Sequence, residues 1–374
     1  MANNNITGEL PTSIENMASL LTLNLAENDI EVDIGYLAFL TNIQALFLQG
    51  NRVYGQLGDW IQIQWPKIEV LDLSDNLILG PLPDTLFRHP SLVIVDLHNN
   101  QFSGPLLIDE GSQLSTIMFL ALQENQLSGP ISPFISYMTN LNHLDLSSNL
   151  LNGAIPEAMF TLPGLVYLFL AYNNFEPGAI PVSIGGMASL VDLSLKKTNR
   201  IGQIPNTIGQ LSKLVLLDLD DNLLTGEIPE SIGGMDNLTF LFLQKNGLVG
   251  EIPMSFSNLQ KLSILLLNQN SLTGPAEAIC APRLPTIVTF VGDCVKPDEV
   301  SFPIPVDTIE LDCPCCTLCC QDSSPSCNNL EWFGDLDPIW EYKYARRAYR
   351  FNEDLIVVPV VDADVDTEFI MPVP

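Results

Sequence analysis

The feature that most constrains the fold is a repeat of about 24 residues that runs through the first three quarters of the chain. The pattern LxxLxLxxN recurs at spacings of 23 to 25 residues, with Thr198 once in the asparagine place. Self-similarity at such a period is typical of solenoids, in which each repeat forms one coil and packs only against its neighbours. The closing asparagines are Asn28, Asn51, Asn76, Asn100, Asn125, Asn149, Asn173, Asn222, Asn246 and Asn270.

The spacing inside the repeat predicts a short strand in each coil. Residues alternate within LxL, so one face of the strand is expected to be buried and the other exposed. In the repeat that ends at Asn149, Leu144 and Leu146 are expected to point inward, and His143 and Asp145 outward. The positions six, four, two and one residues before each asparagine are therefore expected to form an exposed surface.

The second half of the repeat, xLxGxIP, predicts a turn and a stiff return segment. The asparagine amide is expected to be buried and bonded to backbone groups of neighbouring coils, as a ladder along the solenoid. The glycine permits a backbone conformation that other residues avoid, and the proline removes a donor and fixes φ. Each coil is thus expected to bury its apolar edge against the next, in one long core.

The complete unit, LxxLxLxxNxLxGxIP, resembles the plant-type leucine-rich repeat of receptor-like kinases, receptor-like proteins and polygalacturonase inhibitors. The resemblance covers about residues 4–279. It implies an α/β-type leucine-rich-repeat solenoid of about 11 full repeats, with a curved parallel β-sheet on the concave face. Irregular or 3-10 return segments are implied on the convex face. Because such scaffolds recognise peptides, steroids, glycans and proteins alike, the resemblance is weakly specific for function.

Three regions are expected along the chain: a solenoid over residues 1–279, a cysteine-rich C-terminal cap over 280–330, and an aromatic, then acidic tail over 331–374. The end of the tail is expected to be disordered. The first coil, Asn4 to Pro11, reads as the back half of a repeat without its strand. A truncated sequence is the favoured interpretation, and a partner subunit that covers the open end is the alternative.

The eight cysteines allow three interpretations. They are a disulfide-bonded cap made in an oxidising compartment, a zinc site at Cys316-x-x-Cys319, or a redox or iron–sulfur centre. The resemblance favours the cap, because plant-type repeats usually end in one, and the CxCCxxCC run also resembles a signature of microalgal (diatom-type) leucine-rich-repeat proteins. The disulfide candidates are Cys280, Cys294, Cys313, Cys315, Cys316, Cys319, Cys320 and Cys327.

Charge and motifs narrow the function. A net charge of −29 argues against nucleic acid and against anionic membranes as partners. The three histidines, His89, His98 and His143, stand outside any catalytic motif. The sequence therefore predicts a binding protein that is not an enzyme and uses no cofactor or metal. Asn5 and Asn237 lie in N-x-T glycosylation motifs and, with the cysteines, favour an extracellular or cell-surface location. A signal peptide or membrane anchor is expected upstream of Met1.

A candidate ligand face is predicted where aromatic and charged residues gather on the exposed strand positions. An acidic surface with aromatic groups suits a peptide ligand, or a glycan stacked on the rings. The alternative is a solvated face with Lys196/Asp220 and Lys197/Asp221 ion pairs of little energetic value. The predicted face comprises Tyr167, Phe169, Tyr172, Lys196, Lys197, Asp218, Asp220, Phe240 and Phe242.

Three functions remain open from the sequence. The favoured one is the ligand-binding ectodomain of a cell-surface receptor-like protein, with a protein or peptide ligand and possibly a co-receptor. The second is a secreted inhibitor or a cell-wall or adhesion protein, similar to polygalacturonase inhibitors, that binds a hydrolase or a polysaccharide. The third is a cytosolic scaffold with a zinc-bound cysteine cluster.

Overall fold

The computed structural model describes Ala2, residues 4–280 and several short stretches beyond: 287, 289–294, 311–316, 318–320, 349–351 and 357–359. The chain forms two compact units, Met1–Cys320 and Gln321–Pro374. In the second unit the described residues form an antiparallel pair, β28 (Tyr349–Phe351) and β29 (Val357–Pro359). The first unit holds the repeats. The predicted boundaries of the cap and the tail remain predictions.

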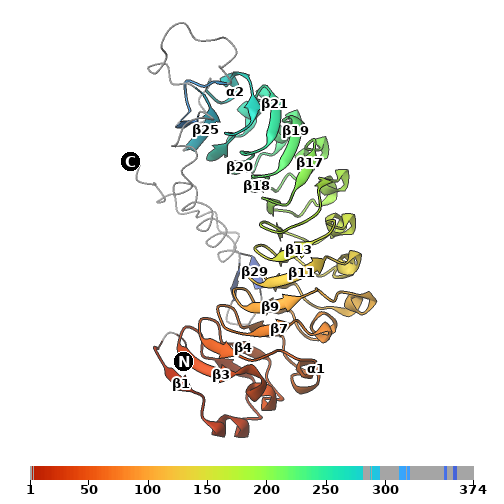
Figure 1. Cartoon of the computed structure of the whole chain (residues 1–374), viewed down its shortest axis with the longest axis vertical. Coiled ribbons are helices and arrows are strands. Elements are labelled where there is room, and N and C mark those ends of the chain that lie inside the picture. Colours follow the sequence, from red (N-terminus) through yellow and green to blue (C-terminus); the bar gives the residue numbers. More distant parts are fainter. Residues whose placement is uncertain are drawn as a thin grey trace. The chain divides into compact units, whose positions relative to one another are not determined.

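Among the described residues of the first unit, the LxL segments and two later strands form a parallel sheet of thirteen strands (Figure 1). Neighbouring strands follow one another in sequence order, because each coil returns its strand beside the preceding one. The last two strands come from the cysteine-rich segment and extend the sheet beyond the repeats. The strands are β2 (Thr22–Asn24), β4 (Ala45–Phe47), β6 (Val70–Asp72), β8 (Ile94–Asp96), β10 (Phe119–Ala121), β12 (His143–Asp145), β14 (Tyr167–Phe169), β16 (Asp192–Ser194), β18 (Leu216–Asp218), β20 (Phe240–Phe242), β22 (Ile264–Leu266), β25 (Thr289–Asp293) and β27 (Leu318–Cys320).

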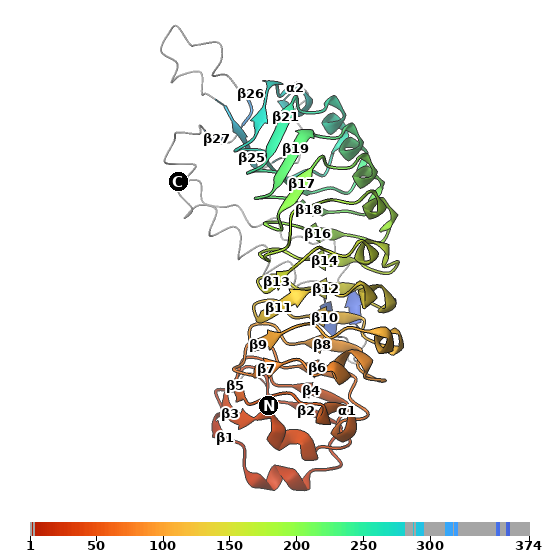
Figure 2. The ribbon, with the colours of Figure 1, turned by 45° about the vertical axis from the view of Figure 1, so that its right-hand side comes forward.

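A second set of short parallel strands, which the sequence analysis did not predict, follows the asparagines (Figure 2). These strands form where xLxG runs extended along the flank of each coil. They are β1 (Thr7–Glu9), β3 (Asp29–Asp33) and β5 (Arg52–Tyr54); β7 (Leu79–Pro81), β9 (Gln101–Gly104), β11 (Gln126–Pro130) and β13 (Leu150–Asn152); β15 (Gly178–Ala179), β17 (Arg200–Gly202), β19 (Leu223–Glu227), β21 (Gly247–Gly250) and β23 (Ser271–Leu272); and β24 (Gly274–Pro275) with β26 (Leu311–Asp312).

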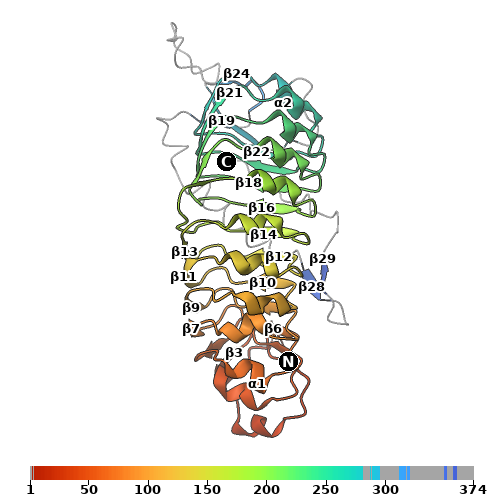
Figure 3. The same cartoon turned by 90° about the vertical axis from the view of Figure 1, so that its right-hand side faces the viewer.

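The return segments are 3-10 helices on the outer side of the coils (Figure 3), as predicted. Most begin directly after the proline of xLxGxIP, whose fixed φ and missing donor suit a helix start. The helices are η1 (Thr12–Asn16), η2 (Ile34–Phe39), η3 (Asp84–Arg88), η4 (Glu110–Leu114), η5 (Pro133–Tyr137), η6 (Glu157–Thr161), η7 (Val182–Gly186), η8 (Asn206–Gln210), η9 (Glu230–Gly234) and η10 (Met254–Asn258), with α-helices α1 (Trp60–Gln64) and α2 (Glu277–Cys280).

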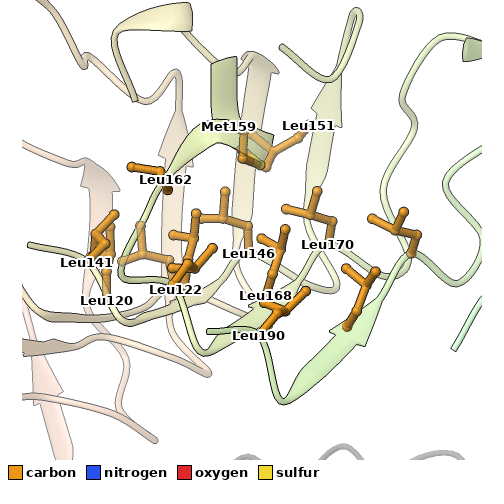
Figure 4. Close-up of a cluster of buried hydrophobic side chains, with 14 of the residues drawn as sticks. Leu120, Leu122, Leu141, Leu146, Leu151, Met159, Leu162, Leu168, Leu170 and Leu190 are labelled. Atoms are coloured by element: carbon orange, nitrogen blue, oxygen red, sulfur yellow. The ribbon is translucent and has the colours of Figure 1, made fainter. Parts of the chain in front are cut away.

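The core lies between the inner sheet and the 3-10 helices and runs from coil to coil without a break. Leu144 and Leu146 are fully buried, as the alternation predicts, and Leu168 and Leu170 repeat them one coil later (Figure 4). Because the leucines of one coil touch those of the next, the stack fixes the curvature of the inner face. That face carries the candidate site.

Candidate ligand-binding face

The asparagine ladder fixes where each inner strand ends. Asn149 accepts a hydrogen bond from the Leu127 amide at 2.9 Å, and its Nδ2 donates to the carbonyls of Leu122, Leu146 and Ser147 at 2.9 to 3.2 Å. The same pattern recurs at other ladder asparagines, among them Asn100 and Asn222. The ladder predicted from the sequence is therefore confirmed, and it holds every strand in one register.

The residue directly before each ladder asparagine adopts a left-handed backbone. Tyr172, Lys197, Asp221 and Lys245 have φ values of 50 to 55°. Such values are uncommon for residues other than glycine, and here the ladder hydrogen bonds hold them in place. The repeat thus turns one side chain per coil away from the strand direction. The sequence analysis placed Tyr172 and Lys197 on the candidate face but did not predict the conformation of any of the four.

Constant register brings the predicted residues of four strands, β14 to β20, into two rows on the inner face. One row runs Tyr167, Asp192, Leu216 and Phe240, and each member lies opposite the next. The second row runs Phe169, Ser194, Asp218 and Phe242. Aromatic side chains therefore stand on both sides of two acidic coils.

The expectation that these positions are exposed is wrong for most of them. Tyr167 is 7% exposed, Phe169 4%, Phe240 2% and Asp218 6%. Side chains of adjacent strands stand about 4.8 Å apart on a concave surface, so large residues cover one another. Phe242 and Tyr172 are half-buried, and Lys197 is exposed.

The first of the two predicted ion pairs is buried rather than solvated. Lys196 Nζ lies 3.1 Å from Asp220 Oδ2, and the two side chains are 3% and 2% exposed. The second pair, Lys197 and Asp221, is exposed and joined at 4.0 Å. Both ammonium groups also lie over the ring of Tyr172, at 5.2 and 5.7 Å from its centroid. The interpretation of a weak, solvated pair thus holds only for the outer one.

Two buried carboxyls give the face its electrostatic character. Asp218 accepts hydrogen bonds from Ser194 Oγ at 2.9 Å and from the Asp220 amide at 3.1 Å. Burial raises the pKa of Asp218 to about 7, against the opposing effect of Lys196. Asp192 is 0% exposed, and the donor that faces its carboxyl is the Leu216 amide. Burial raises the pKa of Asp192 well above its usual range. The predicted face did not include Asp192, although this residue stands six positions before Thr198, at one of the positions expected to form the surface.

A second polar cluster lies on β6 to β12. His98 Nδ1 is 2.6 Å from Asp96 Oδ1, and its Nε2 is 3.5 Å from Asp75 Oδ2. The pKa of His98 is raised to about 10, because these carboxylates outweigh the burial that would lower it. His143 stacks on Phe119 at 4.3 Å, and burial lowers its pKa to about 3. His89 is also fully buried. The exposed placement predicted for His98 and His143 is thus wrong.

The departure from the repeat at Thr198 is compensated by its neighbours. Thr198 Oγ1 donates to the Leu195 carbonyl at 2.6 Å, in place of one asparagine bond. Asn199 Nδ2 reaches the Phe175 carbonyl, and the Arg200 guanidinium donates to the carbonyls of Thr198 and Glu176. This irregular coil is therefore explained by backbone hydrogen bonding without any ligand.

The cysteines that the structure describes are paired. Cys280 is bonded to Cys315, Cys313 to Cys316, and Cys294 is disulfide-bonded as well. Cys316 is thus not free to act as a zinc thiolate in the proposed Cys316-x-x-Cys319 site. The side chains of Cys319 and Cys320 lie outside the described part, as does Cys327. The four cysteines of these two bonds and Cys294 favour the disulfide cap.

The two glycosylation candidates differ in their surroundings. Asn5 is exposed. Asn237 is half-buried, donates to the Ser212 carbonyl at 2.9 Å and accepts from Lys261 Nζ at 2.7 Å. Within the described residues, no helix has the length and apolar character needed to span a membrane. Glycosylation of both residues stays a prediction.

Stacked coils, the asparagine ladder and a continuous parallel inner sheet define a leucine-rich-repeat solenoid. A family model described as "Leucine rich repeat" matches residues 115–175, and a second one matches 67–88, 213–235 and 237–259. Receptor-like protein 7 of Arabidopsis thaliana is 31% identical over 159 residues, which are 42% of this chain and 15% of that protein.

Solved structures of plant receptor ectodomains share the fold. The ectodomain of the receptor kinase GASSHO1/SCHENGEN3 from Arabidopsis thaliana, in complex with CASPARIAN STRIP INTEGRITY FACTOR 2, is 33% identical with a TM-score of 0.70. The match covers 78% of this chain and 38% of that one. The ectodomain of the Arabidopsis receptor kinase HAESA, in complex with an IDA peptide hormone ligand, is 26% identical with a TM-score of 0.60, over 84% of this chain and 60% of that one. The chain is thus similar to plant leucine-rich-repeat receptors and spans less than two thirds of each of these three proteins.

Proposed function

We propose that this chain is the ligand-binding ectodomain part of a cell-surface receptor-like protein and that it binds a peptide along the inner face of β14 to β20. It acts by binding and carries out no catalysis. A co-receptor is the expected second partner. The observation that carries the proposal is the gathering of aromatic and charged side chains on four consecutive strands of a scaffold shared with peptide-hormone receptors.

The inner face has the properties that peptide recognition needs. Its strands are held rigidly by the ladder, so little conformational entropy is lost when an extended ligand binds. Phe242 and Tyr172 offer half-buried rings, which are frequent anchors in protein interfaces. The exposed charges of Lys197 and Asp221 lie at the edge of the same surface, where they can orient a ligand.

The test is a selection of binding peptides from a random phage-displayed library on the full chain. Peptides selected on the wild type are expected to lose at least about tenfold in affinity for Phe242→Ala, because truncation of an interface aromatic removes a large contact. Phe39→Ala is the matched control, since Phe39 is an exposed aromatic residue on η2, on the outer side of the coil. Affinity is measured by biolayer interferometry.

Two outcomes would count against the proposal. Equal affinity of the selected peptides for wild type and Phe242→Ala would place their binding site elsewhere on the molecule. A selection that yields no binding peptide would contradict peptide recognition by this chain.

A further inference from the structure

Five cysteine sulfurs gather at the C-terminal end of the first unit, where α2, β25 and β26 lie together (Figure 2). They form two groups that share Cys313 Sγ, and the sulfurs within each group lie within 4.8 Å of one another. One group is completed by the sulfurs of Cys280 and Cys315, and the other by those of Cys294 and Cys316. Cys313 is therefore bonded to one of these sulfurs, that of Cys316, and lies close to the other three.

The two described disulfides at this end differ in the length of chain that each one closes. Cys280 and Cys315 are 35 residues apart in sequence, whereas Cys313 and Cys316 are 3 apart. A disulfide that closes a short loop adds less to the stability of a fold, so opening of Cys313–Cys316 costs the fold little. Both of its cysteines are half-buried, which leaves part of the bond in contact with solvent. Cys313–Cys316 is therefore a disulfide that a thiol can reach and open in the folded chain.

Backbone contacts keep these sulfurs together when that bond opens. The amide of Ala276, directly before α2, donates a hydrogen bond to the Asp312 carbonyl at 2.9 Å. Leu311 is 2% exposed and belongs to the core. Because these contacts involve no sulfur, a thiolate at Cys313 stays beside the sulfur of Cys280. Its attack on that sulfur is then a reaction within one chain, which is favoured by the proximity of the reacting atoms.

We propose that Cys313–Cys316 is a site of reaction with an external thiol and that Cys313 passes the exchange on to Cys280. The thiolate of the external compound attacks Cys316 Sγ, and Cys313 leaves as a thiolate with the electron pair of the broken S–S bond. Cys313 Sγ then attacks Cys280 Sγ, and Cys315 leaves as a thiolate that takes up the proton of the external thiol. The products are a mixed disulfide at Cys316, a Cys280–Cys313 bond and a thiol at Cys315, without net oxidation or reduction.

The exchange changes which cysteine is free but keeps the end of the solenoid cross-linked. Cys280 is the last residue of α2, and it is bonded to Cys315 before the reaction and to Cys313 of the same segment after it. Helix α2 thus stays attached to the segment that follows β26 throughout. The inference is independent of the peptide site on β14 to β20, because it uses none of the residues on those strands.

The test exposes the oxidised full chain to glutathione at neutral pH, stops the reaction with iodoacetamide and locates each modified cysteine by mass spectrometry. The first products are expected to carry glutathione at Cys316, an alkylated thiol at Cys315 and a bond between Cys280 and Cys313. Chains with glutathione at Cys316 but an alkylated Cys313 and an intact Cys280–Cys315 bond would overturn the transfer to Cys280. No uptake of glutathione by the folded chain would overturn the whole proposal.

Two double variants separate the first step from the second. Cys313→Ser with Cys316→Ser is expected to take up glutathione at least about tenfold more slowly than the wild type, because the accessible bond is gone. Cys280→Ser with Cys315→Ser is the matched control, since it removes the other disulfide; it is expected to take up glutathione like the wild type and to release its thiol at Cys313. Equal uptake by the first variant and the wild type would place the reaction elsewhere and overturn the proposal. Urea unfolding midpoints show whether each variant is folded, and the result for the wild type does not depend on them.

Discussion

At the scale of the residue, a few polar side chains set the geometry of each coil. A ladder asparagine bonds three or more backbone groups that would otherwise be buried without partners, and it holds the preceding residue in a left-handed conformation. Where Thr198 stands in its place, its hydroxyl keeps the bond to the Leu195 carbonyl, and the Arg200 guanidinium donates to the carbonyls of Thr198 and Glu176. Arg200 is 4% exposed, and burial lowers its pKa to about 10. Its role is to donate hydrogen bonds to the backbone carbonyls of Thr198 and Glu176.

Arg200→Met is therefore expected to destabilise the protein by about 2–4 kcal/mol, because the carbonyls of Thr198 and Glu176 lose buried donors. The free energy of unfolding is measured by urea denaturation. Arg52→Met is the control, since Arg52 begins the flank strand β5 as Arg200 begins β17, but its side chain is 59% exposed and pairs with Asp29. A loss for Arg200→Met no larger than that of the control would show that water satisfies these carbonyls instead.

At the scale of the element, the outer 3-10 helices pack closely against those of the neighbouring coils, which their sequence alone does not indicate. In η9 two adjacent glycines have opposite surroundings. A Cβ built on Gly233 would lie 2.4 Å from the Cβ and the carbonyl oxygen of Ser255 in the next coil, whereas a Cβ on Gly234 would meet nothing within 4 Å. Packing between coils therefore requires a glycine at position 233 but not at position 234.

Gly233→Ala is expected to cost about 1–3 kcal/mol of unfolding free energy, because the clash involves backbone of the adjacent coil. Gly234→Ala is expected to be neutral or to stabilise by about 0.5 kcal/mol, since alanine restricts the unfolded chain. Both variants are compared by urea denaturation. Equal effects of the two substitutions would mean that helix propensity and not contact between coils decides the stability of η9.

The sequence predicts the elements better than the surface they present. The strand, the asparagine turn and the proline-led return segment follow from residue spacing, and all three are observed. The burial of Tyr167 and Lys196 on the inner face does not follow, because alternation within one strand says nothing about side chains on the next. The same holds for Asp192, whose burial depends on its cross-strand neighbours Tyr167 and Leu216. The sequence shows that the Thr198 coil is irregular. It does not show that Arg200 donates hydrogen bonds to backbone carbonyls there, because one of these bonds reaches Glu176 in the preceding coil.

At the scale of the whole molecule, the protein combines a large negative charge with several buried carboxyls. Burial raises the pKa of Asp72 and of Asp218 to about 7 and that of Asp145 to about 6. Each of them takes up a proton in the folded state at a pH where the unfolded chain, with carboxyl pKa values near 4, does not. Folding is thus favoured by a moderately acidic pH, and the repulsion among surface carboxylates acts in the same direction.

The free energy of unfolding is therefore expected to rise on the order of 3 kcal/mol as the pH falls from 8 to 5. A carboxyl whose pKa is raised by folding stabilises the protein while it is protonated, and this contribution is lost as the pH rises through the raised pKa. Protonation of Asp72, Asp145 and Asp218 therefore stabilises the fold as the pH falls. His98, with its pKa near 10, adds to the gain, whereas His143, with its pKa near 3, opposes it below pH 6.5 because only the unfolded chain takes up that proton. Burial lowers the pKa of His89 too and raises that of Asp192, so two opposing histidines stand against five groups, which leaves a net rise.

Urea denaturation of the wild type and of Asp218→Asn at several pH values separates this mechanism from general charge repulsion. Asp218→Asn keeps an acceptor for Ser194 but cannot ionise, so its stability should change less between pH 8 and 5 than that of the wild type. Asp221→Asn removes the same charge from an exposed position and should reduce the pH dependence only slightly. Parallel curves for all three proteins would assign the acid stabilisation to surface repulsion, and the Asp218 carboxyl would then be ionised at neutral pH.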